Sequence, residues 1–273
     1  MLNRKKIITI CIVVLISIFA IIIIVLGYRY YKDYRIMSIR KQLFSELNTV
    51  TLENGAMKRF GDAHDGGYLL YDNLMQDVTS AYSYGIDGRD KWGCDISMRY
   101  NLVIHQYDCF NTTKPVCAGG KFVFHEECIG EKYLISDNKT FDSLKNQIIK
   151  NKDEKKKLVV KIDVEGAEWD SFLATPDEVL NTIDQLIVEF HGVDQEKYIK
   201  VFKKLRKIFY LVHVHFNNYA CNDKIQPFPA WAYETLFVNK RIGKPDKTKS
   251  VSPRLAPLDN PNNPVNKDCQ ASQ

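Results

Sequence analysis

The sequence lacks features that would place the chain in several common classes. No internal repeat of about 20 to 50 residues is visible, which excludes a solenoid or propeller built from such units. No basic stripe with interleaved aromatic residues is present despite the net charge of +5, so we expect no nucleic-acid partner. No Cys-x-x-Cys pair is present, which excludes the usual zinc-finger spacing.

The composition supports one folded domain with appendages. The chain has 273 residues, of which 45% are hydrophobic and 12% aromatic. A chain of this length can bury the core of one medium-sized domain. The aromatic content excludes a low-complexity or disordered chain.

Charge is absent from one long stretch, residues 7–27, which follows a short tail at 1–6. At about 1.5 Å per residue, a helix over this stretch reaches roughly 30 Å, the thickness of a bilayer core. No small-residue cleavage site follows it, so we predict a retained anchor rather than a cleaved signal peptide. Basic residues on its two sides nearly balance, and the bias toward a cytoplasmic N-terminus is slight.

The cysteines bear on the orientation. Outside the predicted span their number is even, which suits an oxidising lumen, although reduced thiols in a cytosolic enzyme are the alternative. The sequons at Asn111 and Asn138 match the number expected by chance and carry little weight. We predict a type II single-pass protein with a lumenal domain in the endoplasmic reticulum or Golgi, with a cytosolic-facing domain as the alternative. The six cysteines are Cys94, Cys109, Cys117, Cys128, Cys221 and Cys269.

Two segments flank the predicted domain. Residues 28–51 form a predicted stem with apolar residues at helical spacing. Five of the nine prolines fall between Pro245 and Pro264, so the tail at 246–273 cannot form a helix or an inner strand. The domain itself is therefore predicted at 52–245.

Within the domain, apolar runs alternate with helical patterns. Such alternation predicts an α/β fold with a mostly parallel sheet and helices on both faces. Ligands of such sheets bind at the carboxyl ends of the strands. The predicted strands are 79–85, 101–108, 121–127, 158–163, 184–191, 210–216 and 233–239, and the helices are 140–150, 168–174 and 195–209.

Two strand ends carry a pattern typical of nucleotide binding. The first strand runs into "YGIDG", where Gly85 and Gly88 allow the backbone to approach a ligand closely. The second strand ends at Asp108, 23 residues beyond Gly85, where a carboxylate can accept hydrogen bonds from ribose hydroxyls.

A cluster of acids follows the fourth strand, in "KIDVEGAEWD" at 161–170. Asp163 lies at the strand end, where the sheet opens into the ligand crevice. Glu168 and Asp170 are predicted to charge the first turn of the next helix, at its positive end. Glu165 either does the same or turns into the crevice.

These motifs together resemble a known family. "YSYGIDG", "VIHQYD", "TFDSL", "KIDVEGAEWD" and "LIVEFH" follow the order seen in FkbM-type S-adenosylmethionine-dependent methyltransferases. The resemblance extends to the animal membrane-anchored branch, which also carries "HDGGY", here 64–68. It covers about residues 55–240, and "KIDVEGAE" is its most specific part.

The resemblance implies a class I, Rossmann-like methyltransferase fold with seven strands, six parallel and the last antiparallel. It implies S-adenosylmethionine bound over Gly85, Asp87 and Gly88, with its ribose on Asp108. The loop reads "GIDG" rather than the fuller GxGxG, so the backbone contacts to the cofactor are left open.

Methyl transfer to oxygen requires an aligned acceptor and removal of its proton. The catalytic candidates at adjacent strand ends are Asp163, Glu189, His191 and His215, whereas His213 is expected to be a packing residue. Glu189 and His191 lie two apart on a strand, so they share one face. The acceptor is expected to contact Glu165, Asp65 and Tyr68.

We therefore expect an enzyme that methylates a hydroxyl of a glycan or sugar-bearing small molecule in the secretory pathway. No divalent metal is expected, although one variant of the mechanism places a metal on Asp163 with Glu189, His191 or His215. A lumenal glycosyltransferase using Asp163 and Glu165 with a metal is one alternative. A catalytically inactive methyltransferase fold that serves in binding is the other.

Overall fold

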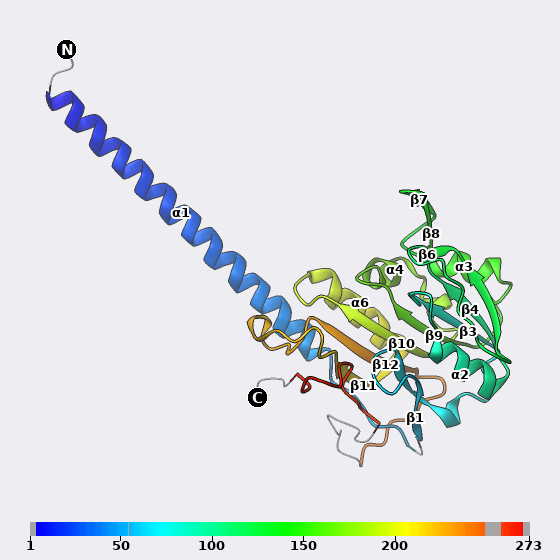
Figure 1. Cartoon of the computed structure of the whole chain (residues 1–273). Helices are drawn as coiled ribbons and strands as arrows, with labels where there is room; N and C mark the ends of the chain where they lie inside the picture. The colour runs from blue at the N-terminus through cyan, green and yellow to red at the C-terminus, as the bar shows by residue number, and fades with distance from the viewer. Residues whose placement is uncertain (1–3, 54, 249–257, 270–273) are drawn as a thin grey trace.

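A seven-stranded sheet forms the centre of the structure, a computed structural model that describes residues 4–53, 55–248 and 258–269, with the backbone alone for 4–11, 13 and 14 (Figure 1). The strand order is β11-β12-β10-β9-β3-β4-β5. Each strand falls on one of the seven predicted apolar runs, so this prediction is confirmed. Their bounds are β3 Ser80–Tyr84, β4 Val103–Tyr107, β5 Lys121–His125, β9 Leu158–Asp163, β10 Ile183–His191, β11 Phe209–Phe216 and β12 Ala232–Asn239.

The sheet is mostly parallel. β3 pairs in parallel with β4 and β9, and the parallel pairing continues to β5 on one side and β10 on the other. β12 is antiparallel to both of its neighbours, β10 and β11. Chain order reverses direction between β3 and β9, and ligands of open α/β sheets bind beside such a reversal, at the carboxyl ends of the strands.

Helices cover both faces of the sheet. On one face, Tyr84, Val160 and Phe190 belong to a core formed with α3, α4, α5, α6 and the end of α1. On the other face, Ala81, Val159 and other strand residues pack against α2 and the hairpin β1-β2. The elements are α2 Lys91–Tyr100, α3 Leu144–Lys150, α4 Glu168–Ala174, α5 Asp177–Leu180, α6 Glu196–Ile208, β1 Met57–Gly61 and β2 Gly67–Tyr71.

α3 is shorter than predicted. The predicted helix at 140–150 overlaps β8, Lys139–Asp142, which pairs with β6, Glu127–Ile129, and β7, Leu134–Ser136. The helix begins after Ser143, whose side chain accepts a hydrogen bond from Asn146 N. A serine N-cap of this kind satisfies one of the free amides at a helix start. The cap at Ser143 therefore marks the boundary between β8 and α3.

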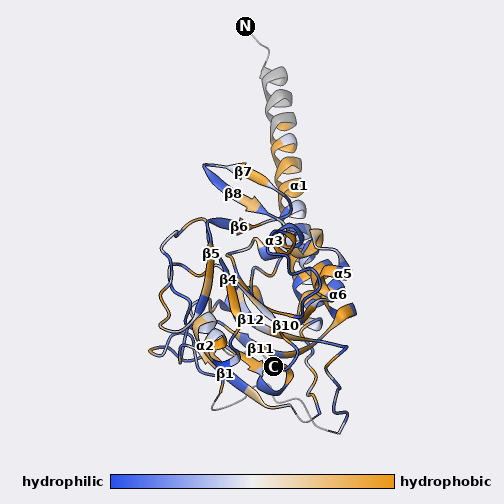
Figure 2. Cartoon of the chain, turned by 90° about the vertical axis from the view of Figure 1, so that its right-hand side faces the viewer, coloured by the Kyte–Doolittle hydropathy of each residue, from blue (hydrophilic) through white to orange (hydrophobic). Residues whose placement is uncertain are grey.

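The N-terminal helix α1, Arg4–Ser45, joins the predicted span and most of the predicted stem without interruption. Among the described residues, it is the one helix long and apolar enough to cross a membrane. Figure 2 shows its apolar residues along the part that projects from the domain. Its last turns dock on the domain, because Ile39 and Leu43 are buried and Arg35 pairs with Glu196 at 2.7 Å. The stem is thus not a free spacer.

Three disulfides join all six cysteines outside the predicted span: Cys94–Cys117, Cys109–Cys128 and Cys221–Cys269. The last one ties the C-terminal tail to the domain. Residues 258–269 consequently belong to the folded domain, which extends beyond the predicted boundary at 245. Parts of the predicted terminal segments, 1–3, 249–257 and 270–273, lie outside the described residues.

Candidate active site

A cavity of about 400 Å³ opens at the reversal point of the sheet. We call it the first cavity. The ends of β3, β4 and β9 contribute Gly85, Asp108 and Asp163 to its lining, and the segment from β6 to β8 adds Ile129 and Phe141. It therefore combines polar strand ends with one apolar wall, as small-molecule sites usually do.

Gly85 is required at the entrance for two reasons. Its φ is +67°, in the left-handed region that favours glycine, and a Cβ there would lie 1.6 Å from the carbonyl oxygen of Asp163. Gly88 also has a positive φ, +74°, and a Cβ there would lie 3.0 Å from the Asn111 side chain. The predicted glycine loop thus brings the backbone close to the β9 end.

Asp108, which is predicted to accept hydrogen bonds from a ribose, is bonded to the backbone through both carboxylate oxygens. Its Oδ2 accepts hydrogen bonds from the backbone amides of Ile86 and Asp87, at 3.2 and 2.9 Å. Its Oδ1 accepts from those of Phe110 and Asn111, at 2.9 and 3.0 Å. A carboxylate has about four acceptor positions, and all four are taken. Asp108 therefore holds the loops after β3 and β4 together.

Asp87 is the exposed carboxylate on the same rim. Its φ is +44°, and its Oδ1 accepts a hydrogen bond from Asn111 Nδ2 at 2.7 Å. Asp87 lines the first cavity and also a second one, of about 280 Å³, beside Asp65 and Tyr68. Of the two carboxylates, Asp87 is exposed and Asp108 is buried.

Asp163 lies where β9 ends. Tyr68 donates a hydrogen bond to its Oδ2 at 3.0 Å, and Lys161 Nζ lies 3.5 Å from the same atom. Lys161 is buried and also donates to the carbonyl oxygens of Tyr84 and Gly85. One cation thus fixes the strand end to the glycine loop and partly neutralises the carboxylate.

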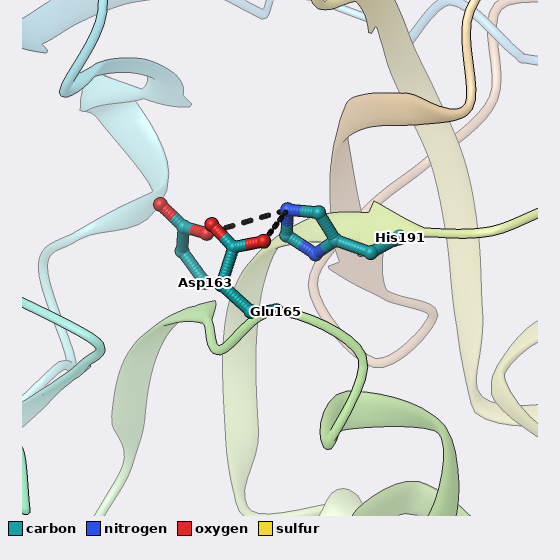
Figure 3. A group of neighbouring side chains, drawn as sticks. All are labelled: Asp163, Glu165 and His191. Carbon is teal, nitrogen blue, oxygen red and sulfur yellow. Dashed lines mark ion pairs between the residues drawn. The ribbon is translucent and has the colours of Figure 1, made fainter. Parts of the chain in front are cut away.

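His191 ends β10 and faces Asp163 and Glu165 (Figure 3). Its Nε2 lies 3.8 Å from Asp163 Oδ1 and 3.5 Å from Glu165 Oε2. Its Nδ1 lies 3.4 Å from Glu168 Oε1. Burial lowers the pKa of His191, but the acids around it outweigh this effect, and the pKa is raised overall.

Glu168 begins α4, as predicted, and is fully buried. Its Oε1 accepts the His191 amide at 2.7 Å and its Oε2 accepts the Gly166 amide at 2.8 Å. Asp170 also lies in the first turn of α4, as predicted, where it is exposed and pairs with Lys197. Glu168 therefore links the β9–α4 loop to the end of β10, beyond any favourable effect on the helix end.

A third cavity, of about 290 Å³, lies beside the first and shares Glu165 with it. We call it the outer cavity. Its lining includes His191, Asp65 and two aromatic residues, Tyr219 and Trp231, which are 61% and 44% exposed. Exposed aromatic faces beside acids and amides suit a ligand with both polar and apolar surface.

Glu189 lies at the inner end of the outer cavity and is buried. It accepts a hydrogen bond from Asn217 Nδ2 at 2.7 Å. Burial, followed by the charges of Asp163 and Glu234, raises its pKa well above the ordinary range. Both effects favour the protonated form of Glu189, which works against its predicted role as a base.

His215 is not brought to these cavities. Its Nδ1 lies 3.5 Å from Glu234 Oε2 and 3.8 Å from Asp259 Oδ1, and its Nε2 lies 3.7 Å from Asp268. Of the three cavities at the strand ends, none has His215 in its lining. His213 accompanies it and pairs with Asp259 at 3.2 Å, as expected of a packing residue. His215 thus belongs to the contact with the tail, and these surroundings do not support its predicted catalytic role.

The predicted "HDGGY" contacts are at the site. Asp65 lines both the second and the outer cavity, and Tyr68 reaches Asp163. Asn262 of the tail donates to Asp65 at 3.0 Å and to Glu234 at 2.6 Å. Sequence reasoning missed Asn262, since nothing in a proline-rich tail indicates such a contact. It also missed Lys161, although a charge inside "LVVKID" was a usable signal.

No model of a known protein family matches the chain, and no curated protein matches its sequence.

Proposed function

We propose that the chain is an S-adenosylmethionine-dependent methyltransferase that acts on a hydroxyl oxygen. The observation that carries the proposal is the first cavity, which lies at the reversal point of the sheet and is bordered by a glycine loop. The strands β5-β4-β3-β9-β10 follow the order 3-2-1-4-5 of dinucleotide-binding sheets, and the antiparallel β12 agrees with the class I methyltransferase fold that the resemblance implies.

The cofactor's parts fit different walls of the first cavity. The apolar wall of Ile129 and Phe141 suits an adenine ring. Asp87 is the carboxylate available to the ribose hydroxyls, whereas Asp108 holds the loop that presents it. Gly85 and Gly88 leave room for the amino acid portion to pass close to the backbone.

The reaction is assigned to the junction of the first and outer cavities. The bond between the sulfonium sulfur and the methyl carbon breaks, a carbon–oxygen bond forms, and the cofactor leaves as the neutral thioether. The acceptor hydroxyl loses its proton to Asp163, whose carboxylate lines the first cavity and is 24% exposed. Glu165 borders both cavities and is placed to orient the acceptor.

The outer cavity favours a polyhydroxyl acceptor. Asp65, Glu165 and Asn217 offer hydrogen-bond partners, and Trp231 and Tyr219 offer flat apolar faces. A sugar ring has both kinds of surface. The three disulfides agree with a lumenal domain, where glycans are present.

A glycosyltransferase remains the second candidate, because Asp163, Glu165 and His191 lie close enough to hold a metal under a nucleotide sugar. The two candidates differ in what binds. A methyltransferase binds S-adenosylmethionine without a nucleotide diphosphate, and a glycosyltransferase does the opposite.

Calorimetry on the full chain in detergent tests the proposal. We expect S-adenosylmethionine and its demethylated product to bind, and a uridine diphosphate sugar with Mn²⁺ not to bind. Phe141→Asp, which places a charge in the apolar wall, should weaken cofactor binding, while Asp170→Asn at the surface should not. Binding of the nucleotide sugar alone would reject the methyltransferase assignment, and binding of neither would leave the inactive binding fold.

The lumenal orientation has its own test. In sealed microsomes the domain should resist protease until detergent is added. Asn138 lies exposed in the turn between β7 and β8, whereas Asn111 borders the first cavity and bonds Asp87. We expect glycosidase treatment to reveal a glycan that Asn138→Gln removes and Asn111→Gln retains. Protease digestion without detergent would place the domain in the cytosol.

A further inference from the structure

Three side chains from two strand ends converge at the junction of the first and outer cavities. Asp163 ends β9, Glu165 follows it, and His191 ends the neighbouring β10 (Figure 3). One ligand atom from each lies within 4.8 Å of the others. Carboxylate oxygens and a neutral imidazole nitrogen are common ligands of divalent cations.

The separations are longer than hydrogen bonds and slightly longer than the spacing between ligands of one metal ion. Metal–ligand bonds of about 2.1 Å place neighbouring ligand atoms about 3.0 Å apart in an octahedron and about 3.4 Å apart in a tetrahedron. His191 Nε2 lies 3.5 Å from Glu165 Oε2 and 3.8 Å from Asp163 Oδ1. Both distances exceed a good N–H···O hydrogen bond of about 2.9 Å. Small side-chain rotations would close them around an ion.

The His191 side chain is held in a way that suits a ligand. It is 8% exposed, and its Nδ1 has no hydrogen-bond partner of good geometry among the described residues. The nearest acceptor to Nδ1 is Glu168 Oε1, at 3.4 Å, from a carboxylate with no exposed surface. Histidine ligands usually direct their second ring nitrogen at a carboxylate or a carbonyl, which fixes the tautomer and aims the other nitrogen at the metal.

The backbone behind the ring is also fixed. Trp169 Nε1 donates to the His191 carbonyl oxygen at 2.7 Å, and Glu168 accepts the His191 amide. These bonds hold the end of β10 in place, so Nε2 points steadily at the two acids. Preorganised ligands of this kind bind an ion at a smaller conformational cost.

The charge around the junction favours a cation. Asp65 and Glu234 lie next to Glu189 in a second acidic group, and Glu189 Oε1 is 3.9 Å from His191 Nε2. Lys161 contacts Asp163 from the opposite side, where its Nζ is already bonded to two carbonyl oxygens. A mobile cation at the junction would offset the remaining negative charge.

We propose that Asp163, Glu165 and His191 bind one divalent cation of the Mn²⁺ type, with Glu168 as the positioning residue behind His191. The set of two carboxylates and one imidazole suits ions that accept both oxygen and nitrogen. Glu165 is 80% exposed, so the ion stays open to solvent on the side of the outer cavity. Water molecules or two neighbouring hydroxyls of an acceptor would fill the remaining coordination positions of the ion.

The binding of the ion does not depend on the methyltransferase assignment, but its use in the reaction does. An acceptor hydroxyl bound to a cation loses its proton more readily, so less is required of Asp163 as a base. The ion would hold that hydroxyl between the two cavities, where the methyl group must arrive. A glycosyltransferase would use the same ion to hold a diphosphate.

Titration with Mn²⁺ alone tests the proposal on the full chain in detergent, after chelator treatment and desalting. The paramagnetic resonance signal of free aqueous Mn²⁺ reports how much ion is bound. We expect one ion per chain in the wild-type protein. Glu165→Gln and His191→Gln should each weaken binding by about 10-fold or more, and Glu168→Gln by about 10-fold. Asp170→Asn, a surface acid on the same segment, should bind as the wild type does.

Glu165→Gln keeps the test meaningful if His191→Gln fails to fold, because Glu165 is mostly exposed. A wild-type chain that leaves the free Mn²⁺ signal unchanged at about 1 mM would overturn the proposal. So would wild-type affinity in Glu165→Gln, or a loss of binding confined to Glu234→Gln, which would locate the ion in the second acidic group. Mn²⁺ binding without S-adenosylmethionine binding would support the site and reject the methyltransferase, so the two failures are distinguishable.

Discussion

The two halves of the site are built in different ways. The half around the first cavity comes from β3, β4 and β9 with the short loops that follow them, and a local disulfide, Cys109–Cys128, closes it. The half around the outer cavity comes from Asp65, Glu165, the end of β10, the segment after β11 and the start of β12. The tail supports it from behind, because Asn262 donates to Asp65 and Cys221–Cys269 ties the tail to the domain. The first half is therefore assembled from neighbouring motifs, and the second from segments that are distant in sequence.

The halves also differ in how their buried acids are held. In the first half, the Asp108 carboxylate is held by four backbone amides. In the second half, Glu189 and Glu234 are buried close to each other and are held by the side-chain amides of Asn217 and Asn262. Backbone donors fix a loop whatever the neighbouring side chains are. The bond from Asn262 to Glu234 holds only while the tail stays in place.

The largest expected effect comes from removing the disulfide of the second half. The double variant Cys221→Ser/Cys269→Ser opens a loop of 48 residues, which costs about 3 to 4 kcal/mol in the chain-entropy account. For a domain of this size, that lowers the melting temperature by about 10 °C. We expect Asn262 to leave the acids, so turnover falls while cofactor affinity stays.

The matched control for that variant is Cys109→Ser/Cys128→Ser, which opens the disulfide of the first half. Cys128 lines the first cavity, so here cofactor affinity should fall. Calorimetry on both double variants separates the two effects. If both variants lose cofactor affinity equally, the halves do not act separately and the comparison is wrong.

The next effect concerns Asp163, which borders the first half and faces the second. Asp163→Asn keeps the shape and the Tyr68 contact but removes the proton acceptor. We expect turnover to fall by about 100-fold, the usual scale for loss of a general base, with cofactor affinity nearly unchanged. Steady-state rates and calorimetry measure the two quantities, with Asp170→Asn as the control. A normal rate in Asp163→Asn, together with an equal loss in Glu189→Gln, would move the base to Glu189.

The sequence predicted the first half far better than the second. "YSYGIDG" contains the end of a strand and its exit loop, and "LVVKID" is a strand followed directly by its loop, so apolar periodicity and turn chemistry identified β3, β9 and the glycine loop together. The seven strands of the central sheet were predicted because buried strands have short apolar runs bounded by polar residues, whereas the strands of the two smaller sheets were not predicted. Their order in the sheet depends on long-range pairing, which no local pattern contains.

The prediction was weakest for contacts between residues that are far apart in the sequence. The sequence of the tail, which is rich in proline and asparagine, gives no sign that Asn262 will contact Asp65. The contact joins positions 197 residues apart. His215 fits a catalytic pattern by its place on a strand, yet Asp259 and Asp268 of the same tail surround it. The pairing of six cysteines was likewise open, since six allow 15 arrangements.

A smaller effect distinguishes Asp87 from Asp108 within the first half. Asp87→Asn removes an exposed charge beside the expected ribose, so we expect S-adenosylmethionine to bind about 10-fold more weakly with no change in melting temperature. Asp108→Asn directs an NH₂ group at backbone amides that need an acceptor, so we expect a loss of stability of about 1 to 3 kcal/mol as well. Calorimetry and thermal melts on both variants decide. Equal stability in the two would show that the four amide bonds of Asp108 contribute little.

The smallest effect is a pH dependence of stability in the first half. His105 lies on β4, stacked near Tyr82, with its Nε2 3.5 Å from the fully buried Asp153. Burial lowers the pKa of His105 to about 4, and the charge of Asp153 offsets this only in part. Burial also lowers the pKa of the neighbouring His125. Both rings therefore stay neutral in the folded protein under conditions where an unfolded chain would protonate them.

Because the folded pKa of His105 lies below the unfolded value of about 6.5, the unfolded state takes up the proton first as pH falls. The stability contributed by the neutral His105 is therefore fully present above about pH 6.5 and decreases as the pH falls toward 4. We expect a loss of about 1 kcal/mol by pH 5, after allowing for solvent screening, and a decrease of a few degrees in melting temperature.

His191 and His215 have raised pKa values and act in the opposite direction, so the wild-type curve alone does not isolate the effect of His105. His105→Asn places a polar group near the position of Nδ1 and removes the titration. Melting curves at pH 7.5 and 5.0 should therefore show a smaller acid shift in His105→Asn than in the wild type. Parallel shifts would mean that folding does not lower the pKa of His105.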